Sequence, residues 1–130
     1  MNAPKELRYA SSDEWLLVSG GSATIGVSDY AQDQLSDVVF FEVSVSVGDV
    51  VNKNSIIATI ESVKAAADVK TPVSGKIIEI NEELANAPEV INSDPYGSAW
   101  ILKIELTDPS QAEALMDADA YTAFCETRGS

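Results

Sequence analysis

The sequence predicts a mostly β fold with a few short helices. β-branched and aromatic residues gather in short apolar segments, and glycine, proline or aspartate separates one segment from the next. These segments lie at 6–28, 37–47, 55–63, 67–73, 74–81 and 99–106. A length of 130 residues with 45% hydrophobic content suits a single core. We therefore expect one domain over residues 1–130, with its core at roughly 6–126 and a flexible tail at 127–130.

The segment at 6–28 predicts a hairpin. Gly20-Gly21 lies at its centre and offers the positive φ values of a tight turn. The apolar residues that alternate around this turn are Leu16, Val18, Ala23 and Ile25. Ser28 is the expected N-cap of a short helix, in which Tyr30, Ala31 and Leu35 have helical spacing. The strand at 37–47 then ends at a Gly48-Asp49 turn.

Lys64 lies between two strand-like segments. Propensity alone favours a short helix over 61–70, because glutamate, lysine and alanine are good helix formers. That helix would be shorter than the ~12 residues an isolated helix needs, and its apolar positions follow no single stripe. We therefore expect a hairpin with Lys64 at its exposed tip. A faint internal repeat, VGDVV at 47–51 and SGKII at 74–78, stands on either side of the lysine.

Turns and short helices are expected in the last third of the chain. Residues 82–84 favour a helical turn, and residues 94–97 have the composition of a tight turn. Asp108 is the expected N-cap of one helix, with proline at the first helical position and Gln111 completing a capping box. Asp117 is the expected N-cap of a last helix that packs on one edge of the sheet. The residues predicted to share its apolar face are Ala120, Tyr121 and Phe124.

Charge and residue types narrow the function classes. The chain has 21 acidic and 8 basic residues, and its formal charge of −13 disfavours nucleic acid and anionic lipid as partners. Because histidine is absent, histidine-based catalysis and metal ligation are excluded. The one cysteine, Cys125, allows no internal disulfide and is expected to pack as a small apolar residue. No apolar run approaches the ~20 residues that span a bilayer, so we expect a soluble protein.

An exposed lysine on a turn is normally just solvated, but the residues around Lys64 also suit a modified one. Val63 and the alanines at 65–67 place no charge and little bulk beside the amine, which suits an enzyme that grips the turn and acylates the nitrogen. An acylated lysine is a long uncharged arm whose end can visit separate active sites. A swinging arm is therefore one role open to Lys64, and an ordinary solvated side chain is the other.

The chain resembles the H protein family of the glycine cleavage system over roughly residues 6–126. The resemblance rests on three segments in the family's order and spacing: DEWLLVSGGSATIGVSDYAQDQLSDVVFFEV, ESVKAAADVKTPVSGKIIEIN and INSDPYGSAWILKIEL. ESVKA resembles the family's lipoylation motif. The resemblance implies the flattened β sandwich or barrel of lipoyl and biotinyl carriers, in which two similar halves place the lysine at a hairpin tip.

The resemblance implies a non-catalytic carrier in glycine catabolism and one-carbon metabolism. Lipoic acid would be joined by an amide bond to Lys64, which lipoate-attaching enzymes would modify. The implied partners are the pyridoxal-phosphate-dependent glycine decarboxylase (P protein), the tetrahydrofolate-dependent aminomethyltransferase (T protein) and dihydrolipoamide dehydrogenase (L protein). The hard chemistry belongs to cofactors and partners. We expect a monomer in the bacterial cytoplasm, with a mature mitochondrial form as the alternative.

The resemblance also implies a cleft that shelters the loaded arm, formed here by Ser12, Glu14 and Asp68. Carboxylates there would attract the protonated amine that the empty arm lacks. Two positions depart from the family's pattern. Asp13 stands where the family usually has histidine, so either the attraction for the amine or the docking of the arm is expected to change. Ala99 stands where glycine is common, which bears on the local backbone geometry.

Other carriers match the sequence less well. A biotin carrier would have methionine on both sides of the lysine, where this chain has Val63 and Ala65. The lipoyl domain of a 2-oxoacid dehydrogenase has Asp-Lys-Ala and lacks the Glu-Trp and DPYG segments. A lipoyl-relay protein that hands lipoyl groups to other complexes would use the same Lys64, and only partner assays separate it from the carrier. A purely structural or adaptor protein would not need Lys64.

Overall fold

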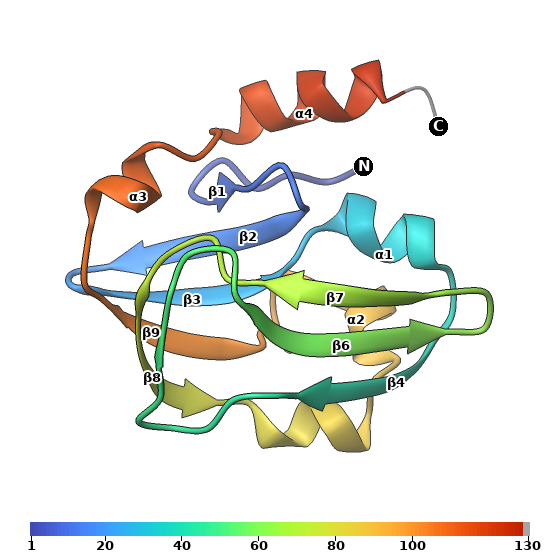
Figure 1. Ribbon diagram of the computed structural model, residues 1–130. Coiled ribbons are helices and arrows are strands. Elements are labelled where there is room, and N and C mark those ends of the chain that lie inside the picture. Colours follow the sequence, from blue (N-terminus) through green and yellow to red (C-terminus); the bar gives the residue numbers. More distant parts are fainter. Residues whose placement is uncertain (129–130) are drawn as a thin grey trace.

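Two antiparallel sheets face each other across the core of the computed structural model, which describes residues 1–128 (Figure 1). The larger sheet has the order β1-β2-β3-β9-β8-β5 and the smaller one the order β4-β6-β7. The strands of the larger sheet are β1 (Arg8–Tyr9), β2 (Glu14–Ser19), β3 (Ser22–Val27), β9 (Leu102–Leu106), β8 (Gly75–Ile80) and β5 (Val50–Val51). Those of the smaller sheet are β4 (Val38–Val43), β6 (Ile56–Ser62) and β7 (Ala66–Lys70). The predicted mostly β fold is confirmed.

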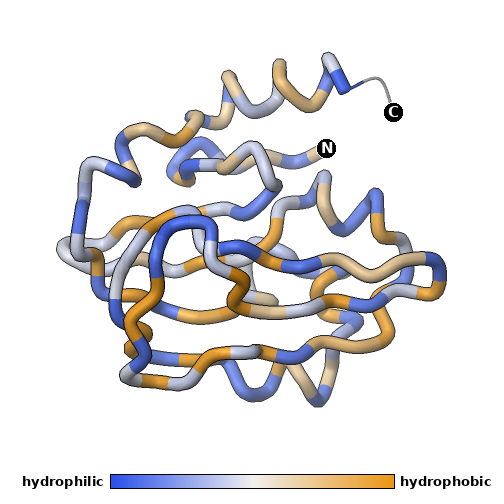
Figure 2. Tube along the Cα trace, viewed as in Figure 1, coloured by the Kyte–Doolittle hydropathy of each residue, from blue (hydrophilic) through white to orange (hydrophobic). Residues whose placement is uncertain are grey.

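The core lies between the two sheets. Ile25 and Ile104 from the larger sheet, and Phe41 and Ile57 from the smaller one, belong to one buried apolar cluster. Figure 2 shows hydrophobic stretches along the strands of both sheets. Because one cluster joins both sheets, each sheet covers the apolar face of the other.

The predicted first hairpin is present, and its turn uses one positive φ value. Ser19 pairs with Ser22 across the Gly20-Gly21 turn, where Gly20 has φ +62° and Gly21 has no positive φ. Of the four apolar residues that alternate around this turn, three are buried and Val18 is 44% exposed.

The helices follow the predicted caps in two of three cases. They are α1 (Asp29–Leu35), the 3₁₀ helix η1 (Glu82–Asn86), α2 (Val90–Ser93), α3 (Ser110–Glu113) and α4 (Ala118–Thr127). The Ser28 hydroxyl accepts from the Ala31 N–H at 3.2 Å, and the Asp117 carboxylate accepts from the Ala120 N–H at 2.8 Å. The sequence did not predict α2. No helix within residues 1–128 is long and apolar enough to cross a membrane.

The capping box predicted for α3 is wrong. Gln111 Oε1 accepts from the Ser74 N–H at 2.6 Å, and its Nε2 donates to Ser74 Oγ at 3.2 Å. The side chain of Gln111 therefore forms hydrogen bonds with the turn before β8 and does not cap its own helix. Asp108 still accepts a hydrogen bond from the N–H of Ser110, at 3.2 Å.

The last helix packs on the edge of the larger sheet, as predicted. It contacts β1, and the Tyr121 ring stacks on Tyr9 with ring centroids 4.6 Å apart. The buried residues of α4 are Ala118, Tyr121 and Cys125. Burial of Cys125 is confirmed, whereas Ala120 is exposed, because the helix turns a different stripe toward the sheet.

The expected tail lies only partly within the described residues. Thr127 is the last residue of α4, and the Arg128 side chain bonds to Asp13. Residues 129 and 130 lie outside the described residues.

Candidate functional site

Lys64 lies in the tight turn between β6 and β7 and is exposed. The Ser62 hydroxyl accepts from the backbone N–H groups of Lys64 at 3.3 Å and Ala65 at 3.1 Å. The backbone N–H of Ser62 donates to the Ala65 carbonyl at 2.7 Å, which closes the turn. The predicted placement of Lys64 at an exposed hairpin tip is confirmed. The sequence analysis did not single out Ser62, although serine is a common turn residue for this reason.

A third strand supports this hairpin almost to its tip. β4 pairs with β6 as far as the Val38–Ser62 pair, and the Val63 N–H donates to the Asp37 carbonyl at 3.0 Å. Lys64 is therefore one residue beyond a hydrogen bond to a neighbouring segment. These hydrogen bonds hold the backbone of the turn in place. The Lys64 side chain therefore extends from a backbone position that is fixed relative to the sheet.

The faint internal repeat corresponds to two segments that pair with each other. Val50 pairs with Lys76 and Val51 with Gly75, so β5 and β8 run antiparallel. The Gly48 N–H donates to the Ile77 carbonyl at 2.8 Å. The two segments therefore pair directly with each other, and the β6–β7 hairpin lies between them in the sequence.

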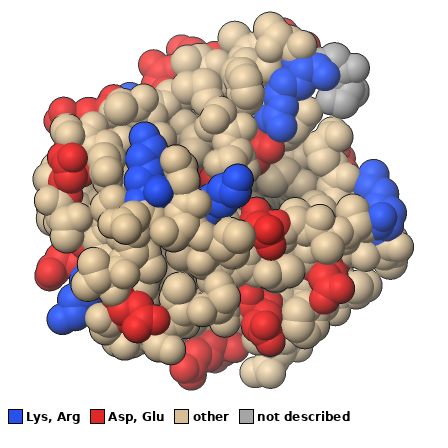
Figure 3. Space-filling view, viewed as in Figure 1, with Lys and Arg blue, Asp and Glu red and all other residues tan. Residues whose placement is uncertain are grey.

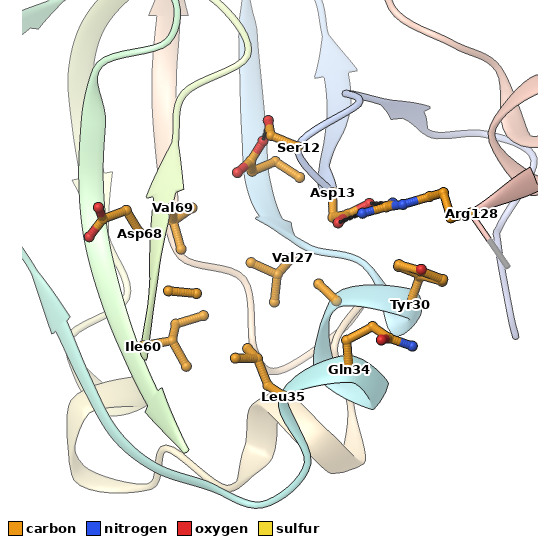
Figure 4. Close-up of a pocket in the computed structure, with 13 residues that line it drawn as sticks. Ser12, Asp13, Val27, Tyr30, Gln34, Leu35, Ile60, Asp68, Val69 and Arg128 are labelled. Atoms are coloured by element: carbon orange, nitrogen blue, oxygen red, sulfur yellow. Dashed lines mark hydrogen bonds and ion pairs between the residues drawn. The ribbon is translucent and has the colours of Figure 1, made fainter. Parts of the chain in front are cut away.

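A cleft of about 290 Å³ lies between β6 and β7 on one side and α1 with the start of β2 on the other. Its floor is apolar and its rim is polar, as Figure 4 shows. The three predicted cleft residues line it: Ser12, Glu14 and Asp68. Apolar contacts come from Val27, Leu35, Ile60, Ala67 and Val69. Figure 3 shows a hollow below the layer that contains α4, with acidic side chains at its edge.

Glu14 is the buried carboxyl group of the cleft. It is 2% exposed, and its carboxylate accepts from the Ser12 hydroxyl and, at 3.1 Å, from the Lys70 N–H. Burial raises the pKa of Glu14 from 4.5 to about 7, although both hydrogen bonds oppose this rise. Near neutral pH the carboxyl group is therefore divided between its neutral and ionised forms.

The other two predicted residues lie at the rim. Ser12 and Asp68 are exposed, and Asp68 comes from β7 on the side opposite Asp13 (Figure 4). The Ser12 hydroxyl is committed to Glu14. The structure thus brings the three predicted residues to one cleft but gives them unequal environments. One is a buried acid, one is its hydrogen-bond donor and one is a solvated acid.

Trp15 fixes the direction in which Glu14 points. Adjacent side chains of a strand project to opposite faces, and the Trp15 indole N–H donates to the Pro95 carbonyl at 2.9 Å. A Cβ atom added at Gly26 would lie 2.5 Å from this indole, so glycine is needed beneath it. The Glu-Trp and DPYG segments therefore meet in space. Ala99, also in this region, is buried and has no positive φ, so alanine fits its backbone there.

Asp13 has a left-handed backbone and a committed side chain. Its φ is +77°, a region that aspartate, asparagine and histidine tolerate better than other side chains do. Its carboxylate accepts from the guanidinium of Arg128 and from the Tyr121 hydroxyl. The sequence analysis did not predict these partners, which are 115 and 108 residues away.

We expect Glu14 to make stability depend on pH. Its raised pKa means that the folded chain binds more protons than the unfolded chain between pH 4.5 and about 7. The free energy of unfolding should therefore fall as pH rises through this window. Glu14→Gln removes the ionisation, and its amide can still accept from the Lys70 N–H while donating to Ser12. At pH 8 the variant should be more stable than wild type by about 1–3 kcal/mol.

Urea unfolding at pH 4.5, 6 and 8 measures this difference. Glu42→Gln is the matched control, because Glu42 is exposed on β4 and outside the cleft. A stability gain for Glu14→Gln that is the same at all three pH values would contradict the assigned burial effect.

Comparisons with known proteins agree with the fold and the motifs. A family model described as glycine cleavage H-protein matches residues 7–128. The glycine cleavage system H protein of Acidobacterium capsulatum is 50% identical over 124 residues, covering 95% of both chains. The mitochondrial glycine cleavage system H protein 2 of Arabidopsis thaliana is 49% identical over 122 residues, covering 94% of this chain and 78% of that one.

A solved structure extends the agreement to three dimensions. The crystal structure of a glycine cleavage system H protein from Mycobacterium marinum aligns with a TM-score of 0.82 at 26% identity. The alignment covers 98% of this chain and 99% of that one. Family model, sequence relatives and fold therefore agree over nearly the whole length, and the chain belongs to the glycine cleavage H-protein family.

Proposed function

We propose that this chain is the lipoyl-bearing carrier of a glycine cleavage system and that lipoic acid is attached to Lys64. The observation that carries the proposal is an exposed lysine at a braced hairpin tip, within ESVKA, in a chain of this family. The lysine amine would form an amide bond with the lipoyl carboxyl group. The carrier itself needs no catalytic residue, because its chemistry is done in its partners' active sites.

When attached to Lys64, the lipoyl group would supply a dithiolane for uptake of the aminomethyl unit at glycine decarboxylase, for its transfer at the aminomethyltransferase and for reoxidation by dihydrolipoamide dehydrogenase. The residues of this chain hold and present the arm. Within residues 1–128 no group of three or more histidine, cysteine, aspartate or glutamate side chains is placed to hold a metal ion. We infer that the chain works as a monomer that visits these three enzymes in turn.

The cleft suits the loaded end of the arm. Asp68 is four residues from Lys64, about 13 Å along an extended strand, and the lysine and lipoyl chains together have a comparable length. The arm can therefore fold back along β7 to the cleft. The apolar floor formed by Val27, Leu35 and Ile60 would cover the hydrocarbon part of the arm and exclude water from the thio-adduct, which is prone to hydrolysis.

Glu14 can discriminate between the empty and the loaded arm. The empty arm is neutral and apolar, and it favours the protonated carboxyl group. The loaded arm ends in a cation, which would lower the pKa of Glu14 and favour the carboxylate. Asp68 adds a second negative charge at the rim. The chain would therefore hold the loaded end more strongly than the empty end.

We further infer a location in the bacterial cytoplasm or, for a mature organellar form, in the mitochondrion. Both kinds of relative are named above, and the relatives match over most of their own length.

We expect Lys64→Arg to abolish lipoylation without affecting the fold. The guanidinium keeps the positive charge but does not form the amide, and a surface change of this kind alters stability by about 0.5 kcal/mol or less. Lys70→Arg is the matched control, because Lys70 is exposed on the same hairpin. Intact mass after incubation with lipoate, ATP and a lipoate ligase measures attachment. A lipoyl mass increase in Lys64→Arg would refute the assigned attachment residue.

We expect Glu14→Gln combined with Asp68→Asn to speed the loss of the loaded group. A hydrogen bond to a charged group contributes about 1.5–3 kcal/mol, so release should rise about 10- to 150-fold, and by a larger factor at low salt than at high salt. Formaldehyde and ammonia released from purified loaded protein measure the rate. Glu42→Gln with Asp119→Asn removes the same two charges from exposed positions outside the cleft and should have no effect. Equal rates for the cleft variant and wild type at both salt concentrations would show that these acids do not hold the amine.

A further inference from the structure

An ion pair closes one side of the cleft rim. Arg128 approaches both carboxylate oxygens of Asp13, with Nη1 to Oδ1 at 2.5 Å and Nη2 to Oδ2 at 3.0 Å. Both residues line the cleft and lie together on one side of it in Figure 4. The pair is partly sheltered, since the side chains are 30% and 14% exposed. A two-point contact of this kind fixes direction as well as distance.

Two aromatic rings also pack against the Arg128 guanidinium. Its central carbon lies 4.3 Å from the centre of the Tyr30 ring and 5.0 Å from that of Phe124. Tyr30 comes from α1 and Phe124 from α4, so Arg128 joins the two helices as well as the start of β2. The end of α4 is therefore fastened across the rim by both charge and ring contacts.

A chain of hydrogen bonds connects this ion pair to the body of the fold. The Ala31 N–H donates to Ser28 Oγ at 3.2 Å, and the oxygens of Ser28 and Tyr121 are 2.6 Å apart. The Tyr121 hydroxyl donates to the Asp13 carboxylate at 2.7 Å, because an ionised carboxylate can only accept. Tyr121 has one proton to give, so the Ser28 hydroxyl must donate to Tyr121. The N-cap of α1, the buried ring of α4 and Asp13 thus form one directed network.

This network settles what Asp13 can do. Its two oxygens already receive two guanidinium N–H groups and one phenol O–H group. An incoming ammonium group would find one acceptor site left, on Oδ2, and a charge that Arg128 already balances. Asp13 is therefore a poor third acid for the amine, and its position in the structure suits a different task.

We propose that Asp13 and Arg128 are positioning residues that fasten the C-terminal end of α4 to the cleft rim and thereby slow the loss of the loaded group. The proposal rests on the proposed carrier function. The two residues act through the rim that they hold in place and need no contact with the arm. Asp13 suits this position in particular, because it combines a tolerance for the left-handed backbone with a charge for Arg128.

The test compares release of the loaded group from wild type, Arg128→Gln and Asp13→Asn. Asparagine tolerates the left-handed backbone, so the Asp13 variant tests the pair without moving β2. Each variant should release the group about 3- to 10-fold faster than wild type, and the double variant no faster than the single ones. Arg128→Lys, which restores the charge but not the two-point contact, should give an intermediate rate.

Two further measurements separate fastening from a change of cleft charge. In a Glu14→Gln, Asp68→Asn background, Arg128→Gln should still speed release by the same factor. In unlipoylated protein, the buried Cys125 thiol of α4 should react faster with a thiol reagent in both variants. Lys103→Gln is the matched control, because it breaks the exposed Lys103–Glu79 pair outside the cleft and should change neither rate.

Unchanged release in Arg128→Gln and Asp13→Asn, with or without faster Cys125 labelling, would overturn the proposal. Slower release would also overturn it, since it would mean that Arg128 acts mainly by repelling the loaded cation. Failure of the carrier function is recognised separately, because glycine decarboxylase would then load none of the proteins, wild type included.

Discussion

The hydrogen bond from the Lys70 N–H to the Glu14 carboxylate, 3.1 Å long, joins the two sheets where they border the cleft. Glu14 begins β2 of the larger sheet, and Lys70 ends β7 of the smaller one. The hairpin that presents Lys64 is thus hydrogen-bonded to the buried Glu14 through β7, its second strand. A buried carboxyl group must have such partners, because an unpaired one costs several kcal/mol. The same bond that satisfies Glu14 also sets the separation of the cleft walls.

This arrangement gives the cleft two properties that oppose each other. Burial beside Val27 and Ile60 makes the cleft hospitable to an apolar arm, and the same burial penalises the charge on Glu14 and raises its pKa to about 7. A cation entering the cleft removes much of that penalty. In the proposed carrier, the acid would therefore gain more of its charge when the arm gains its own, and the empty arm would meet a Glu14 carboxyl group that is only partly ionised. A buried acid that stayed ionised in both states would destabilise the fold more than Glu14 does. It would also distinguish less well between the empty and the loaded arm.

The sequence predicted what depends on local patterns. The turn residues around Lys64 and the caps Ser28 and Asp117 follow from short-range preferences, and each is present. The family resemblance identified Ser12, Glu14 and Asp68 as cleft residues. It did not predict that Glu14 is buried and the other two exposed, because this depends on how the two sheets pack together. Gln111 satisfied the pattern of a capping box and bonds instead to Ser74, 37 residues away. The Asp13–Arg128 pair joins the two ends of the chain, and no periodicity or motif could have paired them.

The central claim is that the loaded end of the arm rests in the cleft. Loading the lipoylated protein from glycine labelled with ¹³C at its methylene carbon places one labelled group at the end of the arm. Isotope-filtered nuclear Overhauser spectroscopy would then detect methyl protons near that group. The account predicts contacts to methyl groups of Val27, Leu35 and Ala67 that weaken in Glu14→Gln. A labelled group with no protein contacts and the mobility of a free chain would contradict it.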